Sequence, residues 1–132
     1  MYKVMIVGHG FVGSAIASLF SDEEKVIVDP KFTDNKISDN SGVPFDAVFV
    51  SVDTPKAEGF KLLDSILCEL DYVMMKGTPV CCKSTATPEF YYEVSQRYKN
   101  IKIVHSPEYL NKSNPVKMFQ GQKFFIIGGD QH

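Results

Sequence analysis

The sequence predicts an α/β protein with a mostly parallel sheet of about six strands between two layers of helices, a three-layer α/β/α arrangement. Short apolar runs alternate with amphipathic stretches along the chain, which is the pattern of βαβ units. The 132 residues match the usual size of one domain. Hydrophobic residues (44%) and charged residues (23%) occur in the proportions of an ordinary globular protein. We therefore expect residues 1–132 to form a single domain.

The N-terminal third predicts two strands, a helix between them and a loop. Residues 2–7 are rich in β-branched side chains and are followed by Gly8. Apolar residues then recur at helical spacing from Val12 to Leu19. Residues 25–28 are expected to form a second strand. Residues 30–44 are polar and have no apolar period, so we expect a long loop there.

The rest of the chain predicts four further strands, at residues 47–52, 79–82, 101–104 and 124–127. A helix between the first two of these is expected to end at Gly77. Its apolar face carries Leu63, Ile66, Leu67, Leu70 and Met74. A second helix should begin after Thr87, because an N-cap residue, a first-turn Pro88 and an acidic Glu89 follow one another there. Its inner face carries Tyr91, Val94 and Tyr98.

Charge, hydropathy and cysteine usage exclude several classes of function. Fourteen basic against sixteen acidic residues give a net charge of -2, so no nucleic-acid partner is expected. No apolar run approaches the ~20 residues of a membrane helix, and the N-terminus does not resemble a signal peptide, so we expect a cytoplasmic protein without membrane contact. The three cysteines, Cys68, Cys81 and Cys82, have neither the number nor the spacing of a disulfide framework or zinc site. No metal site is expected.

A glycine-rich motif stands between the first expected strand and the first expected helix. It reads Gly8-His9-Gly10-Phe11-Val12-Gly13, a G-x-G-x-x-G pattern. In this position Gly8 permits a tight turn, Gly10 lets a pyrophosphate approach the backbone, and Gly13 lets the helix pack close to the strand. The alternative is a turn that serves packing alone. For His9, the sequence favours an exposed side chain without a role over a catalytic one.

Asp29 follows the second expected strand, about 20 residues after the glycine motif. A carboxylate at this place accepts hydrogen bonds from an adenosine ribose and repels a 2′-phosphate. Strand, glycine turn, helix and acid in this order predict a Rossmann-type, doubly wound domain. The expected cofactor is NAD rather than NADP.

These residues resemble the N-terminal, NAD-binding domain of the UDP-glucose and GDP-mannose dehydrogenase family. Three further segments carry the resemblance, which runs over residues 2–129. The stretch Phe49-Val50-Ser51-Val52-Asp53-Thr54-Pro55 is similar to the family's third strand and V-x-T-P turn. Lys83-Ser84-Thr85 is similar to its K-S-T, and Ser106-Pro107-Glu108-Tyr109-Leu110 is similar to its S-P-E-F-L.

The resemblance implies roles for individual residues. The residues implied at the dinucleotide are Gly8, Gly10, Phe11, Val12, Gly13 and Asp29. Thr54 and Thr85 would line the far half of the cofactor. Glu108 would help to activate water near the reacting sugar carbon, and Thr85 would help to hold that water. From the local sequence alone, Glu108 is more simply a solvated loop carboxylate.

The chain also departs from the family pattern. Family enzymes continue into a second domain with a nucleophilic cysteine and the sugar-nucleotide pocket, and these 132 residues contain no such segment. Cys82 does not replace that thiol in our interpretation, because a cysteine in an apolar strand is usually a small buried hydrophobe. A lone domain of this kind would leave Phe119, Phe124 and Phe125 partly exposed, and a homodimer would cover them.

Two functional hypotheses follow. In the first, the chain is the cofactor half of a UDP-sugar dehydrogenase, which oxidises a primary alcohol to a carboxylate once a second domain completes it. A UDP-sugar and a separate catalytic domain are then its partners. In the second, the chain is a standalone NAD-binding module without turnover, such as a sensor, a sequestering protein or a regulatory subunit.

Overall fold

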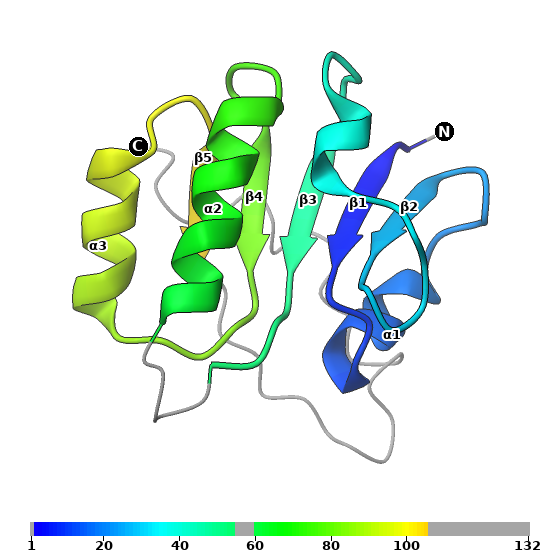
Figure 1. Ribbon diagram of the computed structural model, residues 1–132, viewed down its shortest axis with the longest axis horizontal. Coiled ribbons are helices and arrows are strands. Elements are labelled where there is room, and N and C mark those ends of the chain that lie inside the picture. Colours follow the sequence, from blue (N-terminus) through cyan, green and yellow to red (C-terminus); the bar gives the residue numbers. More distant parts are fainter. Residues whose placement is uncertain (1, 55–59, 106–132) are drawn as a thin grey trace.

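A parallel sheet forms the centre of the molecule in the computed structural model, which describes residues 2–54 and 60–105 (Figure 1). Its five described strands lie in the order β2-β1-β3-β4-β5, and every neighbouring pair is parallel. The strands are β1 (Val4–Val7), β2 (Lys25–Val28), β3 (Ala47–Val50), β4 (Pro79–Cys82) and β5 (Lys102–His105). The predicted α/β fold is confirmed. The expected strand at residues 124–127 lies outside the described residues.

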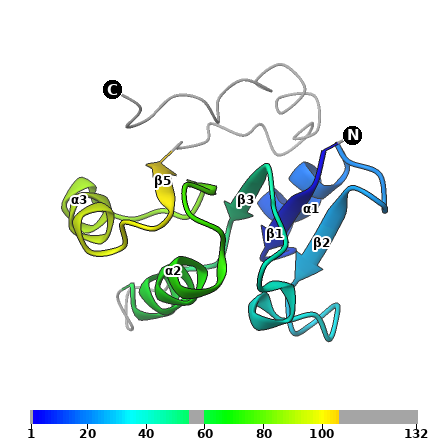
Figure 2. The ribbon, with the colours of Figure 1, turned by 90° about the horizontal axis from the view of Figure 1, so that it is seen from above.

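Helices cover both faces of this sheet (Figure 2). The helix α1 (Phe11–Ala17) lies on one face, and α2 (Lys61–Val73), α3 (Pro88–Arg97) and the short 3-10 helix η1 (Ile37–Asn40) lie on the other. Successive strand residues point to opposite faces, so Val4 and Ile6 pack with α1, whereas Met5 and Val7 pack with α2. A parallel sheet covered in this way is apolar on both sides, which explains why its strands read as continuous apolar runs.

Two elements end earlier than the sequence predicts. β3 ends at Val50, and α2 ends at Val73 rather than near Gly77. Asn100 accounts for the early end of α2, because its side-chain amide donates hydrogen bonds to the carbonyls of Asp71 (2.9 Å) and Met74 (2.8 Å). These carbonyls therefore need no further helical turn. Gly77 instead adopts a positive φ of 86° in the turn that leads to β4.

The stretch at residues 30–44 is more ordered than the expected loop. It contains η1, and Ile37 of this short helix is buried in the core beneath α2. One turn of 3-10 helix is too short to show a hydrophobic period, which is why the sequence did not reveal it. Just before η1, the Thr33 hydroxyl and the side-chain amide of Asn35 both donate to the carbonyl of Ile27, at 2.9 and 3.1 Å. The loop is thereby joined to β2.

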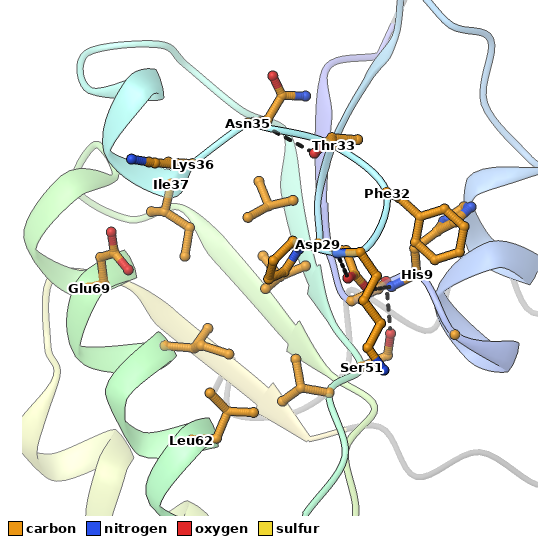
Figure 3. A pocket seen from close by; sticks show the side chains of 18 of the residues that line it. His9, Asp29, Phe32, Thr33, Asn35, Lys36, Ile37, Ser51, Leu62 and Glu69 are labelled. Atoms are coloured by element: carbon orange, nitrogen blue, oxygen red, sulfur yellow. Dashed lines mark hydrogen bonds between the residues drawn. The ribbon is translucent and has the colours of Figure 1, made fainter.

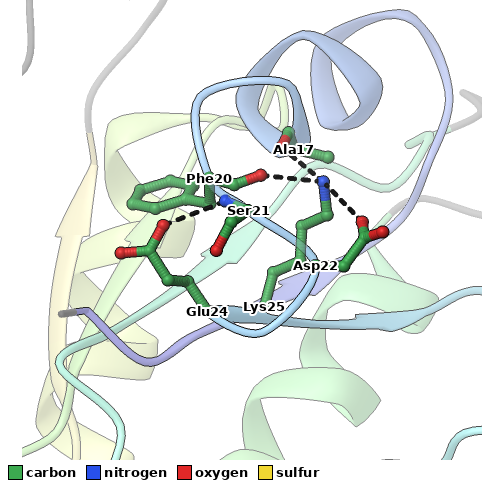
Figure 4. A network of polar contacts seen from close by, with 6 residues as sticks. All are labelled: Ala17, Phe20, Ser21, Asp22, Glu24 and Lys25. Carbon is green, nitrogen blue, oxygen red and sulfur yellow. Dashed lines mark hydrogen bonds and ion pairs between the residues drawn. The ribbon is translucent and has the colours of Figure 1, made fainter.

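The junction between α1 and β2 depends on Lys25, the first residue of β2 (Figure 4). Its Nζ donates to the carbonyl oxygens of Ala17 (2.9 Å) and Phe20 (3.0 Å) and lies 3.7 Å from a carboxylate oxygen of Asp22. A cation at a helix C-terminus satisfies carbonyls that have no partner within the helix. Lys25 therefore stabilises the end of α1 against the start of β2.

The start of α3 follows the sequence prediction. The Thr87 hydroxyl accepts a hydrogen bond from the Phe90 amide at 3.1 Å, and Pro88 is the first helical residue. Tyr91 and Val94 are buried against the sheet, as expected.

Within the described residues, no helix is both long and apolar enough to cross a membrane.

Candidate functional site

A groove of about 1300 Å³ opens at the carboxyl ends of β1, β2 and β3 (Figure 3). Its walls are residues 7–10, the segment 28–39, residues 51–53, and Leu62, Ile66 and Glu69 of α2. Val7 lies opposite Val28 in β2 and Val50 in β3, so the three strands end at one level. The chain leaves β1 toward β2 on one side and returns to β3 on the other. Such a topological switch point is where open α/β sheets bind ligands.

The glycine loop has little room for side chains at two of its three glycines. Gly8 has a positive φ of 97°, and a Cβ added there would lie 2.9 Å from the Ser51 carbonyl oxygen. A Cβ added at Gly13 would overlap the Gly8 carbonyl oxygen, because α1 lies directly against the loop. A Cβ added at Gly10 would have no atom of the described residues within 4 Å. The loop therefore leaves open space at Gly10, beside the groove.

Asp29 joins the glycine loop to the loop that follows β2. One carboxylate oxygen accepts a hydrogen bond from the His9 amide at 2.8 Å, and the other accepts one from the Lys31 amide at 2.9 Å. The bond from Lys31 is the largest cause of the lowered pKa of Asp29, and the bond from His9 acts in the same direction, against partial burial. Asp29 is therefore ionised at neutral pH. Each oxygen keeps a lone pair for a ligand in the groove.

His9 differs from the sequence expectation of an exposed side chain. It is partly buried, and its ring meets the ring of Phe32 edge-on, with 4.6 Å between centroids and 79° between planes (Figure 3). Its Nδ1 atom is buried and has no hydrogen-bond partner in the part of the chain that the structure describes. Phe32 itself is 61% exposed. The two rings form one wall of the groove beside Asp29.

The N-terminus of α1 follows the glycine loop directly. Its first hydrogen bond runs from the Ser14 amide to the Gly10 carbonyl at 2.9 Å, and no side chain of the described residues caps the helix. The amides of Phe11, Val12 and Gly13 precede that bond and have no acceptor within the helix. The groove is lined by Gly8, Gly10 and Asp29 among the residues expected at the dinucleotide, but not by Phe11, Val12 or Gly13.

A second group of expected residues meets at the neighbouring strand ends. The Thr54 hydroxyl donates to the Thr85 carbonyl at 2.7 Å, so the two threonines contact each other as the turns after β3 and β4 come together. The Ser84 hydroxyl donates to the Val52 carbonyl at 2.8 Å and fixes the same two turns. Neither threonine lines the groove. Glu108, the other expected catalytic residue, lies outside the described residues.

Tyr91 supports this second group from α3. Its hydroxyl donates to the Ser84 carbonyl at 2.5 Å, and its ring stacks on His105 with 4.0 Å between centroids. Burial raises the pKa of Tyr91, so its hydroxyl stays a donor. Burial lowers the pKa of His105, and the charge of Lys83 adds to this. The sequence marked Tyr91 as a core residue and gave no signal for its hydroxyl, since the acceptor is a backbone carbonyl.

The buried cysteines offer no reactive thiol. Cys82 is fully buried, and burial strongly raises its pKa, which keeps the thiol protonated. This agrees with the expected role of a small apolar residue. In the part of the chain that the structure describes, no three or more His, Cys, Asp or Glu side chains are grouped so as to hold a metal ion.

Several groove residues were not singled out as site residues from the sequence. Phe32 and Leu62 are 61% and 49% exposed, although they are large apolar residues. Phe32 is an isolated aromatic residue in a polar stretch, and this is the signal that could have identified it. Leu62 and Ile66 are four residues apart and share a helix face. Only the fold shows that this face borders the groove.

No family model and no curated protein matches the chain. Solved structures do match its fold. A UDP-D-ManNAc dehydrogenase from Pyrococcus horikoshii aligns over 89% of this chain and 38% of its own, with a TM-score of 0.68 and 14% identity. A UDP-N-acetyl-mannosamine dehydrogenase from Staphylococcus aureus aligns over 89% and 39%, with a TM-score of 0.65 and 17% identity. The fold is Rossmann-like.

A third similar structure widens the range of substrates among these neighbours. It is a 3-hydroxyisobutyrate dehydrogenase from Mycobacterium tuberculosis, aligned over 89% of this chain and 44% of its own, with a TM-score of 0.69 and 11% identity. The chain thus spans less than half the length of each of these three proteins. At such low identities, the likeness is one of fold.

Proposed function

We propose that the chain is an NAD-binding domain and the cofactor half of a UDP-sugar dehydrogenase. One observation carries the proposal: an ionised Asp29 lies at the switch-point groove, hydrogen-bonded to the glycine loop at 2.8 Å. Two of the structural neighbours are dehydrogenases of UDP-sugars, which supports the substrate class. The K-S-T and S-P-E-Y-L segments support it from the sequence.

The described residues fit a dinucleotide. Open space at Gly10 admits a pyrophosphate close to the backbone, and Asp29 accepts hydrogen bonds from the adenosine ribose. Leu62 and Ile66 offer apolar surface in the same groove for the adenine base. Thr54 and Thr85, at the next strand ends, face the other half of the ligand in this proposal. NAD, when bound, supplies a hydride acceptor.

The proposed chemistry needs residues beyond the described ones. Thr85 holds a water molecule and Glu108 helps to activate it. The primary alcohol would give up two hydrides in succession, each to a separate NAD molecule. A thiol on a second domain would hold the oxidised sugar carbon between these two steps. The water would then cleave the resulting thioester, which yields the carboxylate and restores the thiol. Cys82 does not serve as this thiol, because it is buried and protonated. The chain is thus an oxidoreductase only when completed.

The second candidate is a standalone NAD-binding module that acts as a sensor, a sequestering protein or a regulatory subunit. It is favoured by the fact that the glycine loop, Asp29 and the other described residues that line the groove all lie within residues 7–69. An adjacent reading frame that encodes a cysteine-bearing sugar-nucleotide domain would support the first candidate, because the second requires none.

Calorimetric titration of the full chain with NAD, NADP and UDP-glucose in turn tests the proposed function. We expect NAD to bind with a clear preference over NADP. UDP-glucose should bind weakly or not at all in the absence of a second domain. An absence of NAD binding would refute both candidates.

A further inference from the structure

We propose that His9 and Phe32 form a second specificity element beside Asp29, an aromatic pair that occupies the space a phosphate on the ribose 2′-oxygen would need. The inference rests on the proposed binding of NAD in the groove. It assigns discrimination against NADP to packing as well as to the charge of Asp29.

The position of this pair follows from the contacts of Asp29. A ribose held by the carboxylate places its 2′-oxygen beside the two carboxylate oxygens. The same two oxygens already accept the amides of His9 and Lys31, at 2.8 and 2.9 Å. A group attached to the 2′-oxygen must therefore lie between the glycine loop and the loop after β2. The rings of His9 and Phe32 meet there, with 4.6 Å between centroids.

The pair is held in place from the side of β2. The amides of Phe32 and Thr33 both donate to the Asp29 carbonyl, at 2.9 and 3.0 Å. The Thr33 hydroxyl donates to the Ile27 carbonyl of β2. Phe32 thus stands on a tight turn anchored to the sheet. The buried Nδ1 of His9 has no hydrogen-bond partner among the described residues, and the edge-on contact with Phe32 helps to hold the ring.

Charge alone discriminates weakly at this place. Lys31 is exposed, follows Asp29 by two residues, and its positive charge acts on that carboxylate. A 2′-phosphate would be repelled by Asp29 but attracted by Lys31, and both charges face water, where such interactions are small. A clear preference for NAD therefore requires that the space itself be filled.

Titration of NAD and NADP into variants of the full chain tests this inference. In His9→Ala/Phe32→Ala we expect the affinity for NADP to rise about tenfold relative to that for NAD, with Asp29 intact. Phe32→Ala alone should give part of this change. Phe32→Leu keeps the bulk and should keep the preference. Tyr72→Ala, which removes an aromatic ring that is 90% exposed on α2 and does not line the groove, is the matched control.

Two results would overturn the inference. One is an unchanged affinity ratio in the double variant, with the preference lost in Asp29→Ala, because charge alone would then discriminate. The other is an equal loss of affinity for NAD and NADP, because the rings would then contact a part that both ligands share. Circular dichroism shows whether each variant is folded. Failure of the unaltered chain to bind NAD would refute the proposed function and this inference with it.

Discussion

At the scale of single residues, two glycines of the glycine loop differ in the space that surrounds them. Gly13 has no room for a Cβ because the Gly8 carbonyl occupies its place, whereas the space at Gly10 is open. The lack of room at Gly13 comes from the packing of α1 on β1. At Gly10, no described residue stands where a Cβ would lie, so its glycine is explained in our proposal by a ligand that approaches the backbone there.

A substitution at Gly13 should therefore affect stability, whereas one at Gly10 should affect ligand binding. We expect Gly13→Ala to lower the free energy of unfolding by about 3 kcal/mol, because backbone must move to admit the methyl group. Gly10→Val should unfold like the unaltered chain but lose NAD binding. Urea denaturation and calorimetric titration measure the two effects. A Gly10→Val variant that binds NAD normally would contradict the assigned loop.

Asp29 adds a dependence on pH. Its pKa is lowered below the ordinary value of 3.8, so its hydrogen bonds to the His9 and Lys31 amides contribute stability at any pH above that value. The contribution is lost as pH falls through the lower pKa of the folded state. NAD affinity should thus be constant between neutral pH and the ordinary value of 3.8, and should fall only as pH drops further, through the lowered pKa. Asp29→Asn should bind NAD more weakly at neutral pH and lose this acid-dependent fall in affinity, which titrations across that range would reveal.

At the scale of elements, side chains at strand starts and helix ends decide how the layers join. Lys25 is 15% exposed and binds two carbonyls at the end of α1. We expect Lys25→Met to lower the free energy of unfolding by about 2 kcal/mol, since hydrogen bonds to a charged group contribute about that much. Lys102 also begins a strand, but it is exposed, so Lys102→Met should change stability by less than about 0.5 kcal/mol. Equal values in urea denaturation would contradict the role of Lys25.

Tyr91 tests whether α3 positions the turn that carries Thr85. Tyr91→Phe keeps the stacked ring but removes the bond to the Ser84 carbonyl. We expect NAD to bind about threefold more weakly, which corresponds to a loss of under 1 kcal/mol. ADP-ribose should bind as before, because in the proposed binding mode only the half of NAD that ADP-ribose lacks reaches toward Thr85. Tyr92→Phe, at the exposed neighbouring position, is the control. Equal weakening for both ligands would show that the turn does not contact the far half of NAD.

At the scale of the whole molecule, the chain by itself should not oxidise a UDP-sugar. It spans less than half of each similar dehydrogenase named above, and its Cys82 thiol is buried. With saturating NAD and UDP-glucose, we expect no sustained formation of NADH, as followed by absorbance. Turnover that Cys82→Ser abolishes would contradict this.

Dimer formation through Phe119, Phe124 and Phe125 stays a prediction, because these residues lie outside the described part of the chain.

Local patterns in the sequence were sufficient to predict the α/β class, most strand positions and the glycine loop. The reason is that a strand, an amphipathic helix and an N-cap such as Thr87 each depend on residues close together in the chain. Gly8 and Gly13 belong to the same class, since their motif states a local backbone requirement. The end of α2 was less predictable, because Asn100, which is far along the sequence, binds the carbonyls at that end.

Tertiary structure decided the order of the strands and the composition of the groove. The bond from His9 to Asp29, the contact of His9 with Phe32 and the meeting of Thr54 with Thr85 each join residues 20 or more positions apart. No periodicity encodes such contacts, because they depend on which strands are neighbours and on the level at which those strands end. A motif can thus indicate that Asp29 faces a ribose. Only the packing of two loops shows that aromatic rings stand beside it.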